Sequence, residues 1–368
     1  MALRDYQEEA VLWLCQTRRG MIQCPAGGGK TRIATTAIDR VARSVERHRP
    51  ARVTWLANTR EQCAQALGAL ARLPAIGRLC RVRVECWQSG IDLSAEDLVV
   101  VDECHHASAP KLATMLAAAP RARWGLSATP LGPDPVKNQA LLALFDSRVF
   151  EIARQRIVSG GYLSRARVIF HHDTDPGVWE RVAAEVPRLL QARLRKYPRL
   201  DADEQHRRIT WQLCQRYGIV QNHARNRRII ALCGEHADAS ILILVGTVEH
   251  GEALARELPR AVVCHSGMGV KRRRETIGAF RTGALPVMIA TSLADEGLDI
   301  PRASILVLAS AGRSAAKIEQ RTGRVLRIFN GKEQGLIHDF VDQCHPMLHA
   351  QHRSRLRLYK KLAYDIAV

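Results

Sequence analysis

The stretch CPAGGGKT, residues 24–31, follows the short apolar run GMIQ and places three consecutive glycines directly before a lysine. A glycine inside a regular element costs about 0.5–1 kcal/mol of backbone entropy, so such a run belongs where the chain turns with positive φ or closely approaches a ligand. The helix-prone RIATTAIDRVARSV (32–45) follows it. A strand, a Gly-rich turn and a helix in that order are typical of a phosphate-binding loop, with Lys30 on the phosphates and Thr31 on Mg²⁺. A plain surface turn is the weaker interpretation.

Length and charge limit the class of protein. The 368 residues suffice for two domains of ordinary size. Lys and Arg number 55 against 36 Asp and Glu, which gives a formal charge of +19 and a pI near 10.1. Such an excess favours a polyanionic partner over a merely solvated basic surface. No apolar run approaches the length of a membrane span and the first residues are not signal-like, so we expect a cytoplasmic protein, bacterial or from a phage in its host.

Apolar runs of strand length alternate with helix-prone segments in two groups. This alternation predicts α/β domains with parallel sheets, the first over residues 1–160 and the second over 235–345. The runs of the first group are GMIQC (20–24), RVTWLA (52–57), CRVRVECW (80–87), DLVVVDE (97–103) and RWGLSAT (123–129), and those of the second are ILILVGT (241–247), AVVCHS (261–266), PVMIATS (286–292), SILVLAS (304–310) and GLIHDF (335–340).

The remaining segments are predicted to be mainly helical. Residues 161–234 form a linker and a basic helical insertion, in which YLSRARVIF (162–170) is interpreted as a strand that joins the second sheet. The Arg-rich part of the insertion begins near Val178, and residues 346–368 are expected to form a basic C-terminal helix.

A second acidic motif lies in LVVVDECHH (98–106). Magnesium on the β- and γ-phosphates of a nucleotide requires oxygen ligands, and hydrolysis requires a base for the attacking water. Asp102, at the end of a fully apolar strand, is the candidate Mg²⁺ ligand, and Glu103 beside it is the candidate base. A carboxylate pair that merely caps a helix is the alternative.

These motifs resemble those of the superfamily 2 helicases and translocases, in the same order and over most of the chain. LRDYQ (3–7) resembles the adenine-recognising motif, and CPAGGGKT is similar to motif I in its looser helicase form, with Cys24 where the strict consensus has glycine. The further matches are WLANTRE (55–61) to motif Ia, DECH (102–105) to motif II, SAT (127–129) to motif III, LVGT (244–247) to motif IV, HSGMGVKRRRETIGAFRTG (265–283) to the segment after it, ATSLADEGLDIP (290–301) to motif V and QRTGRVLR (320–327) to motif VI.

The resemblance implies two RecA-like domains in tandem, with ATP and Mg²⁺ between them and nucleic acid across both. It implies that Thr31 and Asp102 hold the Mg²⁺, and that Ser127 and Thr129 couple the nucleotide to the strand. Catalytic roles are implied for Lys30, Asp102, Glu103, Arg324 and Arg327, the two arginines acting as fingers on the γ-phosphate. Nucleotide contacts are implied for Gln7, Ala26, Gly27, Gly28, Gly29, Lys30, Thr31, Gly297, Asp299 and Gln320, and nucleic-acid contacts for Thr59, Arg60, Thr247, Arg273 and Thr291.

The box DECH, in place of DEAD or DEAH, together with LADEGLDIP favours the XPB-like, branch-migration and restriction-type relatives, which act on duplex or branched DNA. We therefore expect an ATP-dependent DNA helicase or translocase. The alternatives are an RNA helicase of the same superfamily and an ATP-gated nucleic-acid clamp or adaptor that does not unwind. A monomer is the default expectation, with a protein partner for targeting. We also hypothesise that the insertion grips duplex DNA through Arg193, Arg195, Lys196, Arg225, Arg227 and Arg228.

Overall fold

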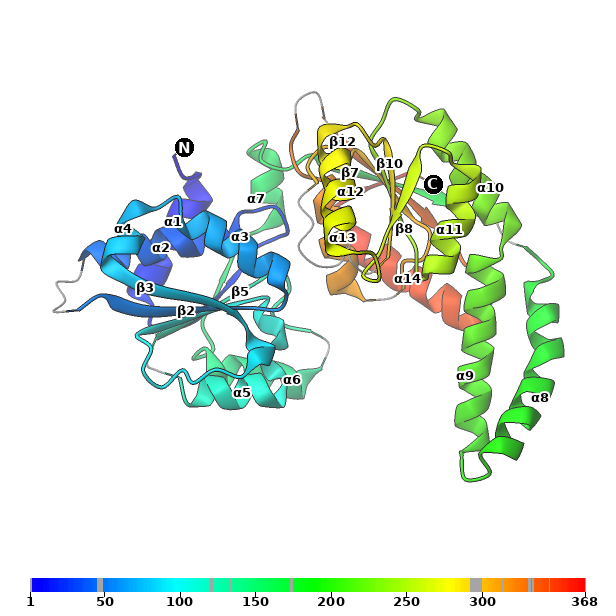
Figure 1. Cartoon of the computed structure of the whole chain (residues 1–368), viewed down its shortest axis with the longest axis horizontal. Helices are drawn as coiled ribbons and strands as arrows, with labels where there is room; N and C mark the ends of the chain where they lie inside the picture. The colour runs from blue at the N-terminus through cyan, green and yellow to red at the C-terminus, as the bar shows by residue number, and fades with distance from the viewer. Residues whose placement is uncertain are drawn as a thin grey trace. The chain divides into compact units, whose positions relative to one another are not determined.

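The computed structural model describes residues 2–44, 49–119, 122–132, 134–172, 175–291, 300–312, 314–329, 332, 334–343 and 345–367. The chain forms two compact units with their boundary between Leu163 and Ser164. Each unit is an α/β domain around a parallel sheet (Figure 1), as the alternation of apolar runs predicts.

The first unit is built on six parallel strands in the order β3-β2-β4-β5-β1-β6. The strands are β1 (Arg19–Gln23), β2 (Ala51–Ala57), β3 (Cys80–Cys86), β4 (Leu98–Asp102), β5 (Ala122–Ser127) and β6 (Val149–Glu151). The helices are α1 (Asp5–Gln16), α2 (Lys30–Ser44), α3 (Arg60–Leu70), α4 (Pro74–Leu79), α5 (Pro110–Ala117), α6 (Pro135–Leu144) and α7 (Arg154–Ser159), with short 3₁₀ turns η1 (Trp87–Ser89) and η2 (Cys104–Ser108).

Helices cover both faces of this first sheet. α1 to α4 pack on one face and α5 and α6 on the other (Figure 1). Strand β4 shows how the sequence serves both layers: Val100 belongs to the core under α1 to α4, whereas Val99 and Val101 belong to the core under α5 and α6. Successive side chains of a strand point to opposite faces, so a strand covered on both sides must be apolar throughout.

The carboxyl ends of the parallel strands carry the motifs of the first unit. The glycine loop follows β1, Thr59 follows β2, Asp102 ends β4 and Ser127 ends β5. Because parallel strands end at the same edge of a sheet, residues separated by up to a hundred positions in sequence come to one edge there.

The second unit is built on seven parallel strands in the order β13-β7-β12-β11-β8-β10-β9. The strands are β7 (Arg165–His171), β8 (Ile241–Leu244), β9 (Ala261–Cys264), β10 (Val287–Ala290), β11 (Ile305–Leu308), β12 (Gln334–Phe340) and β13 (Asp365–Ala367). The helices are α8 (Val178–Lys196), α9 (Ala202–Gln215), α10 (His223–Glu235), α11 (Val248–Glu257), α12 (Val270–Thr282), α13 (Ala315–Val325) and α14 (Pro346–Lys361), with a π-helical turn η3 (Arg216–Val220).

The segment predicted as a linker and insertion is largely part of the second unit. β7 pairs with β12 over its whole length, which confirms that YLSRARVIF joins the second sheet. Ile229 and Cys233 of α10 pack with the sheet residues Ile241 and Ile243, so α10 covers the sheet and does not belong to an insertion. α8 and α9 project from the unit as a helical hairpin (Figure 1). Their small apolar core is shared with Ile219 of η3 and Leu348 of α14.

One of the arginines proposed to grip DNA, Arg225, does not face solvent, and a second, Arg228, is tied to partners within its own unit. Arg225 is 2% exposed and forms an ion pair with Asp342, while its Nε donates to the carbonyl of Ala309 at 3.0 Å. Arg228 pairs with Glu235 at 2.6 Å and its Nε lies 3.2 Å from His171 Nδ1. These contacts hold α10 in place. The grip hypothesis is wrong for the buried Arg225, and it stays a prediction for the half-buried Arg228, the exposed Arg227 and the cations of the hairpin.

The C-terminal segment also differs from the expected single basic helix. α14 ends at Lys361, and residues Asp365–Ala367 form β13, which pairs with β7 at the edge of the sheet. One arginine of this helix, Arg355, is buried. Helical periodicity identifies the polar face of a helix. It cannot tell an exposed arginine on that face from a buried one whose acidic partners come from another element.

Candidate functional site

The glycine loop has the backbone geometry of a phosphate cradle. β1 ends at Gln23 and α2 begins at Lys30, so the loop opens directly onto a helix N-terminus. Gly27 and Gly29 have φ values of 87° and 92°, which strongly favour glycine. A Cβ atom on Gly28 would lie 2.4 Å from the Sγ of Cys24. Cys24 is buried beneath the loop, and its N–H donates to the carbonyl of Ser127 at 2.9 Å.

Lys30 faces the two carboxylates of the acidic motif. Its Nζ lies 3.2 Å from Glu103 Oε1, and only 13% of either side chain is exposed. Glu103 adopts left-handed backbone angles, with φ 49° and ψ 52°, directly after the end of β4. Its N–H donates to Asp102 Oδ1 at 3.0 Å. A non-glycine residue with positive φ is uncommon and is often held so at a functional site.

Burial and mutual repulsion perturb both carboxylates. Burial and the charge of Glu103 raise the pKa of Asp102 to about 7, although Lys30 opposes this. For Glu103, burial acts to raise the pKa, but Lys30 and His105 outweigh it and the pKa is lowered. Burial likewise acts against the charge of Lys30, but the two carboxylates raise its pKa. The site therefore holds more acidic groups than its one lysine can neutralise.

The donor set of the site fits a hard divalent cation such as Mg²⁺. Asp102 supplies carboxylate oxygens, and the hydroxyl of the half-buried Thr31 lies in the first turn of α2. Glu103 Oε2 is buried and has no hydrogen-bond partner among the described residues. Mg²⁺ prefers carboxylate, hydroxyl and phosphate oxygens. Surplus negative charge and an unsatisfied oxygen are what a cation and a bound water would satisfy.

His105 is a site residue that the sequence argument does not assign. Its Nδ1 lies 3.1 Å from Ser127 Oγ and 3.5 Å from Glu103 Oε2. The Ser127 hydroxyl in turn accepts the N–H of Thr129 at 3.2 Å. Burial lowers the pKa of His105 to about 4, so the ring is neutral at pH 7. The repeated histidine of DECHH is the signal that could have identified it, because His105 connects the acidic motif to SAT.

Gln7 lies against the glycine loop. Its side chain is buried, with Nε2 donating to the carbonyl of Gly28 at 3.1 Å and Oε1 accepting the N–H of Arg4 at 3.2 Å. Tyr6 donates to the same Gly28 carbonyl at 3.0 Å. Both ends of the Gln7 amide are therefore bound to backbone, so its predicted adenine contact would require it to exchange one of these partners.

Thr59 and Thr247 occupy equivalent positions in the two units. Thr59 caps α3 by accepting the N–H of Gln62, and Thr247 caps α11 by accepting the N–H of His250. Gln62 completes a capping box on Thr59, a function that the spacing T-x-x-Q predicts. The exposed Arg60 begins α3. N–H groups that stay free at such helix starts favour bound anions, and the phosphate contacts of these residues remain a prediction.

The other predicted residues of the second unit that the structure describes lie on or just after three of its elements. Thr291 follows β10, Arg273 is half-buried on α12, and Gln320 and Arg324 lie on α13. Arg324 is buried, and Arg327, just after α13, has its pKa lowered by burial and then by Arg281. The predicted nucleotide contacts Gly297 and Asp299 lie outside the described residues.

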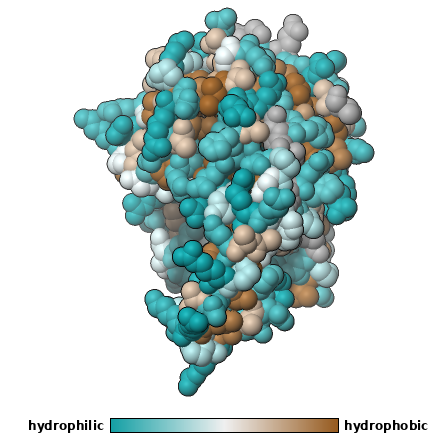
Figure 2. Space-filling view, turned by 90° about the vertical axis from the view of Figure 1, so that its right-hand side faces the viewer, coloured by the Kyte–Doolittle hydropathy of each residue, from teal (hydrophilic) through white to brown (hydrophobic). Residues whose placement is uncertain are grey.

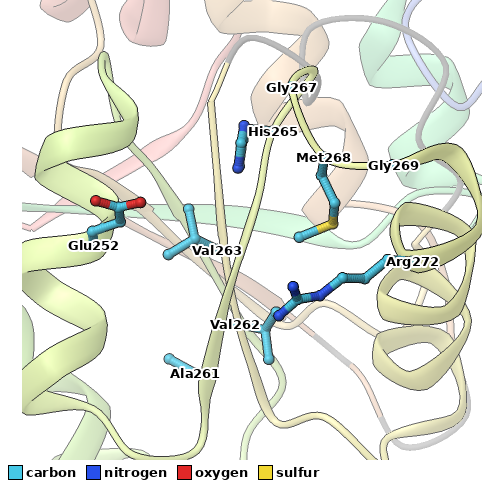
Figure 3. Close-up of a pocket in the computed structure, with 9 residues that line it drawn as sticks. All are labelled: Glu252, Ala261, Val262, Val263, His265, Gly267, Met268, Gly269 and Arg272. Atoms are coloured by element: carbon cyan, nitrogen blue, oxygen red, sulfur yellow. The ribbon is translucent and has the colours of Figure 1, made fainter.

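A hollow of about 510 Å³ lies at the β9 edge of the second sheet (Figure 3). Arg272 reaches into it from α12, and Glu252 approaches from α11 on the other side. None of the predicted site residues lines this hollow. The candidate site is therefore the loop and strand edge of the first unit. Among the residues that the structure describes, no helix is both long and apolar enough to cross a bilayer.

Comparisons with known proteins agree with these motifs. Residues 1–77 match the family model of the type III restriction enzyme res subunit, and residues 224–329 match that of the helicase conserved C-terminal domain. A protein of Sulfolobus islandicus filamentous virus named helicase 22 is 30% identical over 67% of this chain and 42% of its own. The DNA 3'-5' helicase XPB of Kineococcus radiotolerans is 23% identical over 99% of this chain and 64% of its own.

The helicase domain of Pyrococcus furiosus Hef has a similar fold, with a TM-score of 0.62 at 16% sequence identity, over 96% of this chain and 98% of that domain. The present chain thus spans between about two fifths and two thirds of the length of the two sequence relatives named above.

Proposed function

For a chain that belongs to superfamily 2 of the helicases and translocases, we propose an ATP-driven motor that hydrolyses ATP to move on duplex or branched DNA. The observation that carries the proposal is the contact of Lys30 with Glu103 beside Asp102, on a glycine loop with two positive φ values. A structural ion pair would not need this loop.

The side chains suggest how the reaction proceeds. Lys30 leaves Glu103 for the β- and γ-phosphates when ATP binds, since phosphates carry more charge than one carboxylate. Glu103 is then free to accept a proton on its carboxylate from the water that attacks the γ-phosphorus, as the bond to ADP breaks. His105 lies beside this carboxylate, with its Nδ1 3.5 Å from Oε2, and connects it to Ser127. Thr31 and Asp102 would hold Mg²⁺, which when bound neutralises charge on the phosphates.

Residues of the second unit complete the proposal. We assign Arg324 and Arg327 to the γ-phosphate as arginine fingers, and Gln320 to the nucleotide. Gln7 and the loop residues Ala26 to Gly29 would hold the nucleotide from the first unit, and Gly297 and Asp299 its ribose side. Thr59, Arg60, Thr247, Arg273 and Thr291 would contact the sugar-phosphate backbone, which fixes position without reading sequence.

The proposal of DNA as the track is supported by relatives named as DNA 3'-5' helicase and DNA 3'-5' translocase, which align over most of this chain. Three relatives named as RNA helicases align over 26%, 40% and 30% of it. A charge of +19 supports either nucleic acid. ATP turnover measured with single-stranded DNA, duplex DNA, forked DNA and RNA separates the two tracks, and RNA as the strongest activator would contradict the proposal.

Two substitutions test the chemistry. Lys30→Ala should abolish ATP turnover and leave DNA binding without nucleotide nearly unchanged, because Lys30 contacts phosphates of ATP and not of DNA. Glu103→Gln should bind ATP and fail to hydrolyse it, since the amide cannot accept the proton. Turnover of Glu103→Gln at the wild-type rate would show that another group is the base. The exposed Glu61→Gln on α3 is the matched control and should retain turnover.

A further inference from the structure

The hairpin of α8 and α9 has a pocket of about 420 Å³ between its helices. Leu189, Ala192, Arg193 and Lys196 line it from one face of α8. Tyr197 follows them, and Ile209, Gln212 and Leu213 face them from α9. Figure 2 views the molecule from the side of this hairpin and shows apolar side chains exposed among hydrophilic ones toward its lower end.

The floor and the rim of this pocket differ in chemistry. Ile209 and Leu213 are almost fully buried and form an apolar floor. Leu189 and Tyr197 are 40% and 48% exposed, which leaves an aliphatic and an aromatic surface open at the mouth of the pocket. The rim carries the cations of Arg193 and Lys196 and the exposed amide of Gln212, and no acidic side chain lines the described pocket.

Arg193 has a buried hydrogen-bond donor without an acceptor: its Nε has no hydrogen-bond partner among the described residues. Lys196 Nζ lies 5.4 Å from the centre of the Tyr197 ring and has no carboxylate within salt-bridge distance in the described part of the chain. A buried donor of a charged group without an acceptor is costly, so an anionic ligand that accepts from it would bind favourably.

We propose that this pocket binds one unpaired nucleotide of a nucleic-acid strand. The base lies on the apolar floor against Tyr197, the amide of Gln212 meets its polar edge, and the phosphate accepts from Arg193 and Lys196. The inference rests on the proposed function, because that function supplies a nucleic acid to the surface of the protein. It adds a contact that distinguishes an unpaired base from a paired one.

An acidic peptide could satisfy the same two cations, but the chemistry favours a nucleotide. Base stacking on an aromatic ring is independent of sequence and contributes about 1–3 kcal/mol per base in other proteins. A base within a duplex is covered on both faces and cannot enter, so the pocket discriminates single-stranded from blunt duplex DNA. The exposed Arg195, which does not line the pocket, would contact the backbone of either form.

Fluorescence anisotropy with a labelled single strand and a blunt duplex of the same length tests the proposal on the full chain without nucleotide. Tyr197→Ala should raise the Kd for the single strand about 5-fold or more and leave the Kd for the duplex within about 2-fold. Tyr197→Phe keeps the ring and should bind like wild type. Arg193→Gln should reduce the slope of log K against log salt on the single strand by about 0.7, whereas Tyr197→Ala should not change it.

Arg195→Gln is the matched control and should weaken both forms by the same factor. An equal loss on both forms for Tyr197→Ala, or no loss on either, would overturn the proposal. Photocrosslinking to a single strand with 5-iodouracil should label Tyr197, and labels that map only to other parts of the chain would also overturn it. ATP turnover of Tyr197→Ala without DNA should equal that of wild type. If the wild-type protein bound neither form of DNA, the proposed function itself would be contradicted. That outcome is distinct from a loss of single-strand preference in Tyr197→Ala, which concerns the pocket alone.

Discussion

Replacing Arg355 by methionine is expected to destabilise the second unit severely. Arg355 is 2% exposed, and its Nε donates to Asp339 Oδ2 at 2.8 Å. Its other nitrogens donate to the carbonyls of Phe340 at 2.9 Å and Gly312 at 3.0 Å. Asp339 also accepts the hydroxyl of Tyr359 at 2.8 Å. Arg355 thus joins α14 to the end of β12, and methionine would fill much of its volume but leave the buried carboxylate without its cation.

The magnitude follows from this arrangement. Removing one partner of a buried ion pair costs about 3–5 kcal/mol, because the other charge remains buried and unpaired. In a domain of 150–250 residues each kcal/mol lowers Tm by about 2–4 °C, so Arg355→Met should lower Tm by about 6–20 °C. The exposed Arg353→Gln, two residues away on α14, should change Tm little. Adding Asp339→Asn to Arg355→Met should recover part of the loss, because it removes the unpaired charge.

Thermal unfolding measured by calorimetry, together with hydrogen exchange of the amides in β12 and α14, assigns the change to the second unit. The reasoning is refuted if Arg355→Met melts within about 2 °C of Arg353→Gln, or if Asp339→Asn adds a further loss to that of Arg355→Met. Gly312 precedes Ser314, the cap of α13, so ATP turnover of Arg355→Met below its melting temperature should also fall if Arg324 on that helix acts as a finger.

Three further outcomes are expected. Binding to duplex DNA should weaken with salt with a log–log slope of about −0.9 for each phosphate neutralised, and a flat dependence would contradict backbone contacts. Asp102, with a pKa raised to about 7, is protonated below that pH and must lose its proton to hold Mg²⁺. The Mg²⁺ concentration that half-saturates ATP turnover should therefore be higher at pH 6 than at pH 8. Equal concentrations at the two pH values would argue against Asp102 as a ligand. Arg195→Gln with Arg199→Gln should reduce duplex-stimulated ATP turnover without lowering Tm, whereas Arg225→Gln should lower Tm by several degrees. If the double variant and Arg225→Gln changed turnover and Tm alike, burial would not distinguish a structural arginine from a DNA-binding one.

The sequence by itself determined the parallel α/β architecture and the glycine loop between β1 and α2. Fully apolar runs such as LVVV (98–101) are sufficient evidence, because every side chain of a strand that is covered on both faces is buried. The positive φ of Gly27 and Gly29 could also be predicted from the sequence, because it is a local property of the turn. The placing of Asp102 at the end of β4 followed from the end of its apolar run.

Only the tertiary structure decided which charged groups meet. Lys30 and Glu103 lie 73 positions apart and touch because β1 and β4 end at one edge of the sheet. The burial of Arg225 depends on Asp342, which lies 117 positions further along the chain, so a run of arginines alone cannot separate it from the exposed Arg195. Short-range patterns report a residue's own backbone and face, whereas burial and partners of a charge are set by segments that folding brings from elsewhere.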